Sequence, residues 1–331
     1  MQIDPRVLHN LIDNMFATES PIPPPYTQGR SIVTSVYNGE FATGYVLLRE
    51  LKRLGNTLPI EVFHRAGELS KIQIDILTST DPKHVIVKQI QGNAKDFTTP
   101  YGTKAGWSTK IYAIYESAYA ENLWIDADNF PIVKPEYLFN DPEYLIKHCL
   151  FWRDMMSPDR ANRYHDNAPI WPVFNVSPND GEPFETGQFL INKPRCWPQF
   201  RLVKHYADNC QVYYNFGGDT ETFRMAWQHW HLRNDGKQLY INYQSDPNVP
   251  YGFMPYGPFH KGVPNEFKKW GGGTVMVQRA RDGSELFNHR NINKMKLHGN
   301  VVNPDIQNEQ LYHNHIDDLK VILNTIEAPN G

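Results

Sequence analysis

Asp126 and Asp128, two aspartates one residue apart, are the residues of this chain whose types and spacing most clearly allow chemistry. They follow the apolar run Leu123-Trp124-Ile125, which is typical of a buried strand. Residues i and i+2 of a strand point to the same side, so we expect both carboxylates to aim at one point. Two carboxylates that close repel each other unless a cation lies between them. The pattern therefore predicts a divalent metal site that keeps positions open for phosphate oxygens.

The triplet alone is not specific, because aspartates also cap helices and occupy solvated turns. The apolar strand before Asp126 favours the metal site over these alternatives. Asn129, the next polar residue, is expected to have a structural role in the turn that follows.

The elements that must position these aspartates alternate along the first half of the chain. Their pattern predicts a buried strand over 31–36, a helix over 41–54 that Gly55 ends, strands over 59–63 and 84–90, and a helix over 106–120 before the strand that ends at Asp126. This alternation predicts an α/β layer with a largely parallel sheet. Ligands of such sheets bind at the carboxyl ends of the strands, where Asp126 and Asp128 lie.

The flanking and second-half segments are less regular. The pattern predicts a short N-terminal helix, a proline-rich linker over 20–25, strands over 147–151 and 186–192, helices over 194–209, 221–231 and 306–326, and loops over a cleft in the Pro-, Gly- and Tyr-rich residues 234–273.

Bulk properties exclude several classes of protein. The 331 residues carry a net charge of −3 and no basic stripe, so nucleic acid is not an expected partner. No apolar stretch approaches the roughly 20 residues of a membrane span, and the first 16 residues do not resemble a secretory signal. The three cysteines, Cys149, Cys196 and Cys210, have no metal-type spacing and indicate reduced thiols. We therefore expect a cytoplasmic protein; the oligomeric state stays open.

Five blocks of residues, in order, resemble the fungal Golgi α-mannosyltransferases that extend mannan side chains. They are residues 29–68, residues 106–139 with Gly106-Trp107-Ser108-Thr109-Lys110 and Ile125-Asp126-Ala127-Asp128-Asn129, residues 185–191, residues 213–224, and His289-Arg290-Asn291 with Lys294. The resemblance implies a GT-A fold with a mostly parallel, Rossmann-like central sheet and a loop-rich acceptor half. It also implies retaining transfer, an Mn²⁺ or Mg²⁺ ion, a nucleotide-diphosphate sugar donor, GDP-mannose by family habit, and a glycan or glycoconjugate acceptor.

The same resemblance divides the chain. Residues 1–28 would form the N-terminal helix and linker, and residues 301–331 the C-terminal helix. Residues 29–300 would form the transferase domain, with a nucleotide-binding half over 29–140 and an acceptor and catalytic half over 141–300. The fungal enzymes carry a membrane anchor and a stem, and no such segment is recognised here, so a soluble relative is expected.

Several residues are candidates for binding the metal and the donor. A neutral imidazole is a good third ligand for an Mn²⁺-class ion, and the fifth block favours His289 over His298. Lys294 would neutralise the leaving diphosphate, and Asp126 would ligate the metal through water or hold the ribose. The remaining donor candidates are Thr34, Ser35 and Tyr37 at the end of the first strand, for base and ribose, and Lys110, for the diphosphate or sugar hydroxyls. The alternatives are strand-end packing for the first three and a solvated lysine for Lys110.

Catalytic and acceptor candidates lie in the second half. A retaining transferase needs a polar group near the donor sugar to stabilise an oxocarbenium-like transition state, and Gln188 and Asp219 are the candidates. Asp219 also fits a helix N-cap. Gly187 permits close approach of backbone to ligand. The acceptor candidates are Gly187, Gly218, Asp219 and Trp152, although core packing is the alternative for any tryptophan.

Three other functions remain open at this point. The first is a transferase of the same fold with a UDP-sugar donor, and the second is a non-catalytic sugar-binding relative. The third is a phosphotransferase with Asp126 as nucleophile, which Phe130 and Pro131 disfavour.

Overall fold

The protein is described by a computed structural model. The structure describes residues 4–18, 22–94, 97–99, 102–104, 106–153, 171, 174, 184–213, 219–233, 275–280, 282–290, 294–300, 302 and 306–327. The predicted loops over 234–273 lie outside these residues. The chain divides into two compact units: unit 1 is Met1–Val33, Ile90–Trp124 and Leu138–Tyr243, and unit 2 is Thr34–Gln89, Ile125–Tyr137 and Gln244–Gly331.

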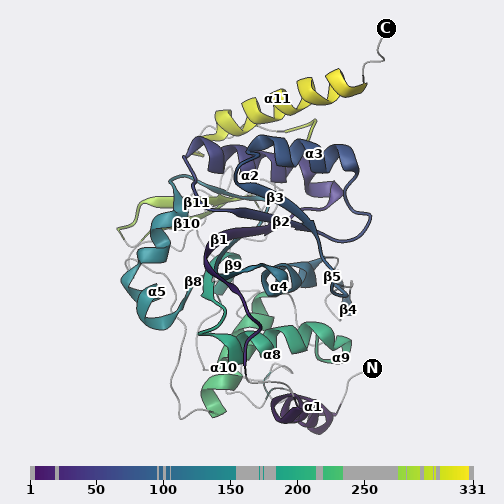
Figure 1. The fold of residues 1–331 in the computed structure, drawn as a ribbon, viewed down its shortest axis with the longest axis vertical. Helices are drawn as coiled ribbons and strands as arrows, with labels where there is room; N and C mark the ends of the chain where they lie inside the picture. Colours follow the sequence, from purple (N-terminus) through teal and green to yellow (C-terminus); the bar gives the residue numbers. More distant parts are fainter. Residues whose placement is uncertain are drawn as a thin grey trace, which may run out of the picture. The chain divides into compact units, whose positions relative to one another are not determined.

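In unit 2, parallel strands β2 (Ile60–His64) and β3 (Val85–Gln89) form the centre. The chain leaving β1 (Thr27–Ser35) lies beside β2, because the Val36 N–H donates to the Phe63 carbonyl at 2.8 Å. Helices α2 (Phe41–Arg53) and α3 (Lys71–Thr80) cover one face of β2 and β3, with α11 (Glu309–Glu327) packed against α2 (Figure 1).

Local sequence explains these helices. Phe41, Tyr45, Leu48 and Leu51 give α2 a buried side, and Gly55, at φ 73°, follows its end as predicted. The sequence interpretation overlooked α3, although Ser70 and Gln73 form a capping box at its start.

A second sheet in unit 2 consists of three antiparallel strands in the order β10-β11-β7. These are β10 (Met276–Arg279), β11 (Glu285–His289) and β7 (Asn129–Pro131). β7 and β11 are separated by more than 140 residues of sequence but lie side by side. β7 begins directly after Asp128, and β11 ends at His289.

In unit 1 the strands follow the order β1-β6-β9-β8. β6 (Tyr119–Ile125) pairs parallel with β1, whereas β8 (Cys149–Arg153) pairs antiparallel with β9 (Phe184–Asn192). The mixed, mostly parallel sheet with helices confirms the predicted α/β class. The remaining elements are α1 (Pro5–Thr18), η1 (Asn38–Glu40), β4 (Phe97–Thr99), β5 (Gly102–Lys104), α4 (Trp107–Glu116), η2 (Pro135–Asn140), α5 (Pro142–Lys147), α8 (Trp197–Asp208), α9 (Cys210–Tyr213) and α10 (Asp219–Arg233).

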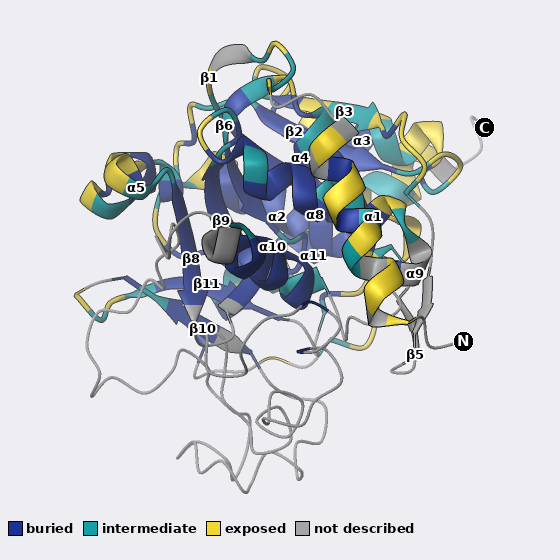
Figure 2. Cartoon of the chain, turned by 90° about the horizontal axis from the view of Figure 1, so that it is seen from below, coloured by how far each residue is buried: buried dark blue, intermediate teal, exposed yellow. Residues whose placement is uncertain are grey.

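The core of unit 1 is aromatic. Phe189 of β9 stacks on Phe151 of β8 at 5.1 Å, and Phe223 of α10 lies 4.8 Å from Phe189. Trp227, one turn further along α10, meets Phe151 edge-on at 5.3 Å. Figure 2 shows that α8 and α10 are largely buried, which is what this packing requires.

Several boundaries differ from the predicted ones by a few residues, and two of these differences have a clear local cause. The helix predicted over 106–120 ends at Glu116, because Ser117 is extended (ψ 132°) and β6 begins at Tyr119. Lys147, predicted to begin a strand, is the last residue of α5, which Asp141 caps at its start. Among the described residues, no helix is long and apolar enough to cross a membrane.

Candidate functional site

Asp126 and Asp128 lie in a tight turn between β6 and β7, not in a strand. β6 ends at Ile125, and the Asn129 N–H donates to the Asp126 carbonyl at 2.9 Å, which closes the turn. The expected two-residue strand alternation is therefore wrong as the reason for their convergence. The turn brings the two carboxylates together instead, and Asn129, buried at the start of β7, has a backbone role in it.

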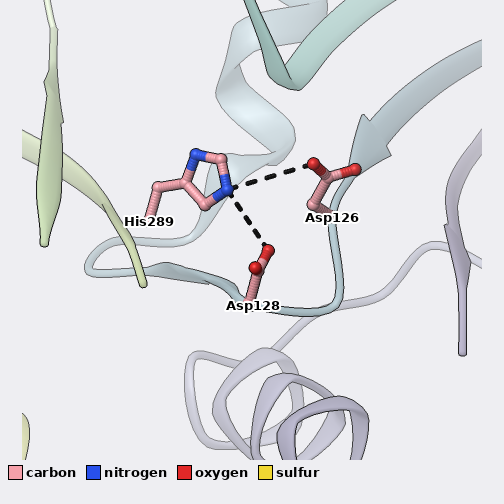
Figure 3. A group of neighbouring side chains, drawn as sticks. All are labelled: Asp126, Asp128 and His289. Carbon is pink, nitrogen blue, oxygen red and sulfur yellow. Dashed lines mark ion pairs between the residues drawn. The ribbon is translucent and has the colours of Figure 1, made fainter. Parts of the chain in front are cut away.

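His289 completes the group from the other strand of the pair. It is the last residue of β11 and lies opposite Asn129 in the antiparallel register. Its Nε2 is 3.2 Å from Asp128 Oδ1 and 3.9 Å from Asp126 Oδ2, so the imidazole faces both carboxylates (Figure 3). One ligand atom from each residue lies within 4.8 Å of the others.

This group fits a divalent metal ion. Bonds of roughly 2.1 Å place neighbouring ligand atoms about 3 to 4 Å apart around one ion, close to the separations found here. Two carboxylates and an imidazole suit an ion of the Mn²⁺ or Mg²⁺ class. The three side chains could therefore hold a metal, as the sequence predicted, while His298, the competitor, is exposed and outside the group.

Lys294 lies on the other oxygen of Asp128. Its Nζ is 2.7 Å from Asp128 Oδ2 and also pairs with the Glu40 carboxylate. Burial alone would raise the pKa of Asp128, but His289 and Lys294 hold that pKa well below its usual value. Asp128 is thus a buried, ionised carboxylate whose charge is matched by basic groups.

Glu40, in the 3-10 turn η1 after β1, is the residue of this cluster that sequence reasoning missed. Burial, followed by the charge of Asp128, raises its pKa to about 7 against the opposing effect of Lys294. The signal was its place just beyond the carboxyl end of a parallel strand, where ligands of α/β sheets bind.

The donor candidates at the end of β1 are placed in the same unit as this cluster. Thr34 is buried, and its hydroxyl has no hydrogen-bond partner in the part of the chain that the structure describes. Tyr37 is 45% exposed, and its ring lies over Gly39, where an added Cβ would come within 2.6 Å of the ring. Burial, followed by the charge of the Glu40 carboxylate, raises the pKa of Tyr37. Ser35 is half-buried between them.

Unit 1 holds a second polar cluster. Lys110 of α4 is only 6% exposed, which excludes the solvated alternative. Its Nζ donates to the Thr186 carbonyl at 2.7 Å and to Thr186 Oγ1 at 3.2 Å, and it pairs with Asp219 at the start of α10. The Thr186 hydroxyl also donates to Asp219 at 3.2 Å. Lys110 and Asp219, predicted separately, therefore form one largely buried ion pair, and Thr186 is a member of the cluster that the sequence did not reveal.

The remaining predicted residues of unit 1 lie on the paired strands β8 and β9 or outside the residues that the structure describes. Gln188 is fully buried on β9, and the Gly187 N–H beside it donates to the Glu185 carboxylate at 2.7 Å. Trp152 is 1% exposed, a position typical of core packing, the alternative left open for it. Gly218 lies outside the described residues.

Solved glycosyltransferases have the same fold. The chain aligns with the galactosyltransferase LgtC at a TM-score of 0.53 and 11% identity, covering 87% of this chain and 95% of that one. It aligns with the glycosyltransferase GlyE of Streptococcus pneumoniae TIGR4 at a TM-score of 0.52 and 15% identity, covering 90% and 63%. The fold is the GT-A fold, as predicted.

The sequence matches a mannosyltransferase family over part of its length. Residues 29–179 match the model of the family described as "Mannosyltransferase putative". The α-1,2-mannosyltransferase MNN2 of Saccharomyces cerevisiae is 27% identical over 152 residues, which are 45% of this chain and 25% of that protein. MNN24 of Candida albicans is 32% identical over 157 residues, covering 37% and 22%. The matched region is about a quarter of the length of these relatives, and it confirms the predicted resemblance.

Proposed function

We propose that this protein is a metal-dependent, retaining glycosyltransferase that moves a hexose, mannose from GDP-mannose, onto a sugar hydroxyl of a glycan or glycoconjugate. The observation that carries the proposal is the Asp126, Asp128 and His289 group, with the Lys294 ammonium beside it. The fold shared with LgtC and GlyE supports sugar transfer, and the relatives' names support mannose.

The donor diphosphate is assigned to unit 2. Asp126, Asp128 and His289 would hold Mn²⁺ or Mg²⁺, which when bound supplies positive charge for the diphosphate. Lys294 adds a fixed cation at the same place and stabilises the charge that develops on the leaving group. The Glu40 and Asp128 carboxylates orient this lysine.

The nucleoside end of the donor is assigned to the residues after β1. The exposed Tyr37 ring offers a stacking surface for the base. The buried Thr34 hydroxyl and the Ser35 side chain supply hydrogen-bonding groups for base or ribose.

The catalytic and acceptor candidates come from unit 1. Gln188 and Asp219 would stabilise the oxocarbenium-like transition state. Lys110 holds the Asp219 carboxylate in place through their ion pair. Gly187, Gly218 and Asp219 are the acceptor candidates, whereas Trp152 is packed in the core. In a retaining reaction the acceptor hydroxyl attacks from the face that the diphosphate leaves. A diphosphate oxygen can accept the hydroxyl proton, so the reaction needs no strong protein base.

The identity of the donor has a specific alternative, a UDP-sugar. LgtC is a galactosyltransferase, so the shared fold is equally compatible with a UDP-sugar donor. The names of the sequence relatives favour mannose.

The test is Mn²⁺-dependent release of GDP or UDP from a panel of nucleotide sugars, with and without a mannose oligosaccharide as acceptor. Wild type is compared with Asp128→Ala and with Asp75→Ala, which removes an exposed aspartate of α3 in the same unit. We expect GDP release and a mannosylated product, lost in Asp128→Ala and kept in Asp75→Ala. UDP release from a UDP-sugar, without GDP release from GDP-mannose, would show that the donor is a UDP-sugar. No transfer and no thermal stabilisation by any nucleotide would favour a non-catalytic sugar-binding protein.

A further inference from the structure

The residues on both sides of the metal-ligand candidate His289 are bound to the C-terminal helix region. Asn288, fully buried on β11, donates from Nδ2 to the Gln307 carbonyl at 2.9 Å and to the Tyr312 hydroxyl at 3.2 Å. Gln307 precedes α11 and Tyr312 lies within it. The end of β11 is therefore held by α11 from one side of His289.

Arg290, on the other side of His289, also binds α11. Its guanidinium group is 1% exposed and pairs with the Glu309 carboxylate at the start of α11. Glu309 also lies 3.2 Å from His313 Nε2, one turn further along the helix. The Arg290 backbone N–H donates to the Asp128 carbonyl at 2.8 Å, so this one residue is bonded both to α11 and to the second metal-ligand candidate.

α11 contacts the opposite strand as well. The Tyr312 ring lies 4.7 Å from the ring of Phe130 on β7. Phe130 pairs with Asn288 across the two strands. Tyr312 thus touches both strands from which the candidate ligands are presented.

The buried ion pair between Arg290 and Glu309 suggests a role in positioning rather than in stability. A buried ion pair adds little net stability compared with apolar residues of similar size, because both ions lose their hydration. In some proteins, such a pair selects one geometry for the groups that it joins. Groups that orient metal ligands without touching the ion typically change metal affinity by about 10- to 100-fold when they are altered.

We propose that α11 is a brace for the metal site, in which Glu309, acting through Arg290, is a positioning residue for His289 and Asp128. The proposal rests on the proposed function for the presence of the metal, and on the described contacts for the role of α11. Both histidines in the first half of this helix take part in its packing: His313 contacts Glu309, and His315 is buried 2.7 Å from Glu50.

A second buried carboxylate on the same helix interface provides a matched control. Glu50 of α2 is fully buried and binds His315 of α11 and Arg53 of its own helix. It joins α11 to α2, whereas Glu309 joins α11 to the residue after β11. Loss of either carboxylate should destabilise the fold, but only Glu309 should affect the metal.

The experiment titrates Mn²⁺ alone into metal-free wild type, Glu309→Gln and Glu50→Gln, by calorimetry and by the electron paramagnetic resonance of free Mn²⁺. Thermal unfolding is recorded on the same samples. We expect both variants to unfold at lower temperature, Glu309→Gln to bind Mn²⁺ about tenfold more weakly, and Glu50→Gln to bind it as wild type does. Equal Mn²⁺ affinity in Glu309→Gln and wild type overturns the proposal, and so does an equal loss in both variants.

Tyr312→Phe decides the question if Glu309→Gln does not fold. It removes the hydroxyl contact with Asn288 and keeps the ring against Phe130. Weaker Mn²⁺ binding in this folded variant supports the brace, and unchanged binding overturns it.

The two proposals fail in different ways. Weakened Mn²⁺ binding in the brace variants, without sugar transfer by wild type, would remove the proposed function and leave the brace. Sugar transfer by wild type with unchanged Mn²⁺ affinity in the variants would do the reverse.

Discussion

Lys294 Nζ lies 2.7 Å from Asp128 Oδ2, while the other oxygen of that carboxylate, Oδ1, lies 3.2 Å from His289 Nε2. The two oxygens of one aspartate thus face different partners. Oδ1 faces the imidazole with which it could share a metal ion, and Oδ2 faces the ammonium group that we propose as a partner of the donor phosphate. Metal binding and donor binding therefore depend on different oxygens of Asp128 in the proposed function.

Lys294→Met should separate metal binding from donor binding. Loss of the ammonium removes a cation from the diphosphate site, and we expect kcat/KM for the nucleotide sugar to fall about 100-fold, equivalent to about 2.7 kcal/mol. Mn²⁺ affinity should stay equal or rise, because a competing positive charge next to Asp128 is gone. Steady-state kinetics and Mn²⁺ titration measure the two effects. Lys296→Met, at an exposed lysine nearby, is the control and should change neither. A parallel loss of metal affinity would show that Lys294 acts by holding the site together.

Glu40→Gln should change how stability depends on pH in the metal-free protein. The Glu40 pKa, raised to about 7 by burial and the Asp128 charge, exceeds its ordinary value of 4.5. The folded state therefore holds this proton more tightly, and the resulting stability is complete below pH 4.5 and is lost as pH rises through 7. Asp126, Asp128 and Lys294 are the charged groups that act on Glu40.

The measurement is urea unfolding with a chelator at pH 4.5, 6 and 7.5. The free energy of unfolding of wild type should fall relative to that of Glu40→Gln as the pH rises. We expect this change to be on the order of 1–3 kcal/mol between pH 4.5 and 7.5. A constant difference would contradict a raised Glu40 pKa. Asp75→Asn, at an exposed aspartate of the same unit, is the control for general charge effects.

Much of the fold was predictable because its signals are local. The β-branched run at 31–36, the apolar spacing from Phe41 to Leu51 and the glycine at 55 each specify their element without distant contacts. The carboxyl-end rule then located Asp126 and Asp128 correctly, although a turn and not a strand brings them together.

The partners of the candidate site were not predictable by the same means. Glu40 meets Lys294 across 254 residues, and Thr186 meets Lys110 across 76. Arg290 and Glu309 are ordinary charged residues in the sequence, and only the packing of α11 makes them a buried pair. Periodicity reports which side of an element is buried, and it carries no information about which distant side chain lies there.

Lys110 and Asp219 should show strong coupling in a double-mutant cycle. Either Lys110→Met or Asp219→Leu alone leaves one charge without its ion-pair partner in a largely buried place, and should cost about 3 kcal/mol of unfolding free energy. The double variant should cost less than the sum by 1 kcal/mol or more, since it leaves no charge behind. Urea unfolding of the four proteins gives the coupling. Additive losses would mean that the pair is not formed in solution.

Gly44→Ala should destabilise unit 2 and weaken donor binding together. An added Cβ at Gly44, inside α2, would come within 2.5 Å of Val36 Cγ2, closer than real contacts allow. Alanine favours a helix over glycine by about 1 kcal/mol, but overpacking a buried site costs about 1–3 kcal/mol, so a net loss is expected. Because Val36 directly precedes Tyr37, displacing it should also raise the KM for the nucleotide sugar. Val36→Ala in the same protein removes the clashing methyl groups and should recover part of both losses. If the effects of Val36→Ala and Gly44→Ala on unfolding and on KM are instead additive, the close approach of Val36 to α2 does not position the donor-binding residues.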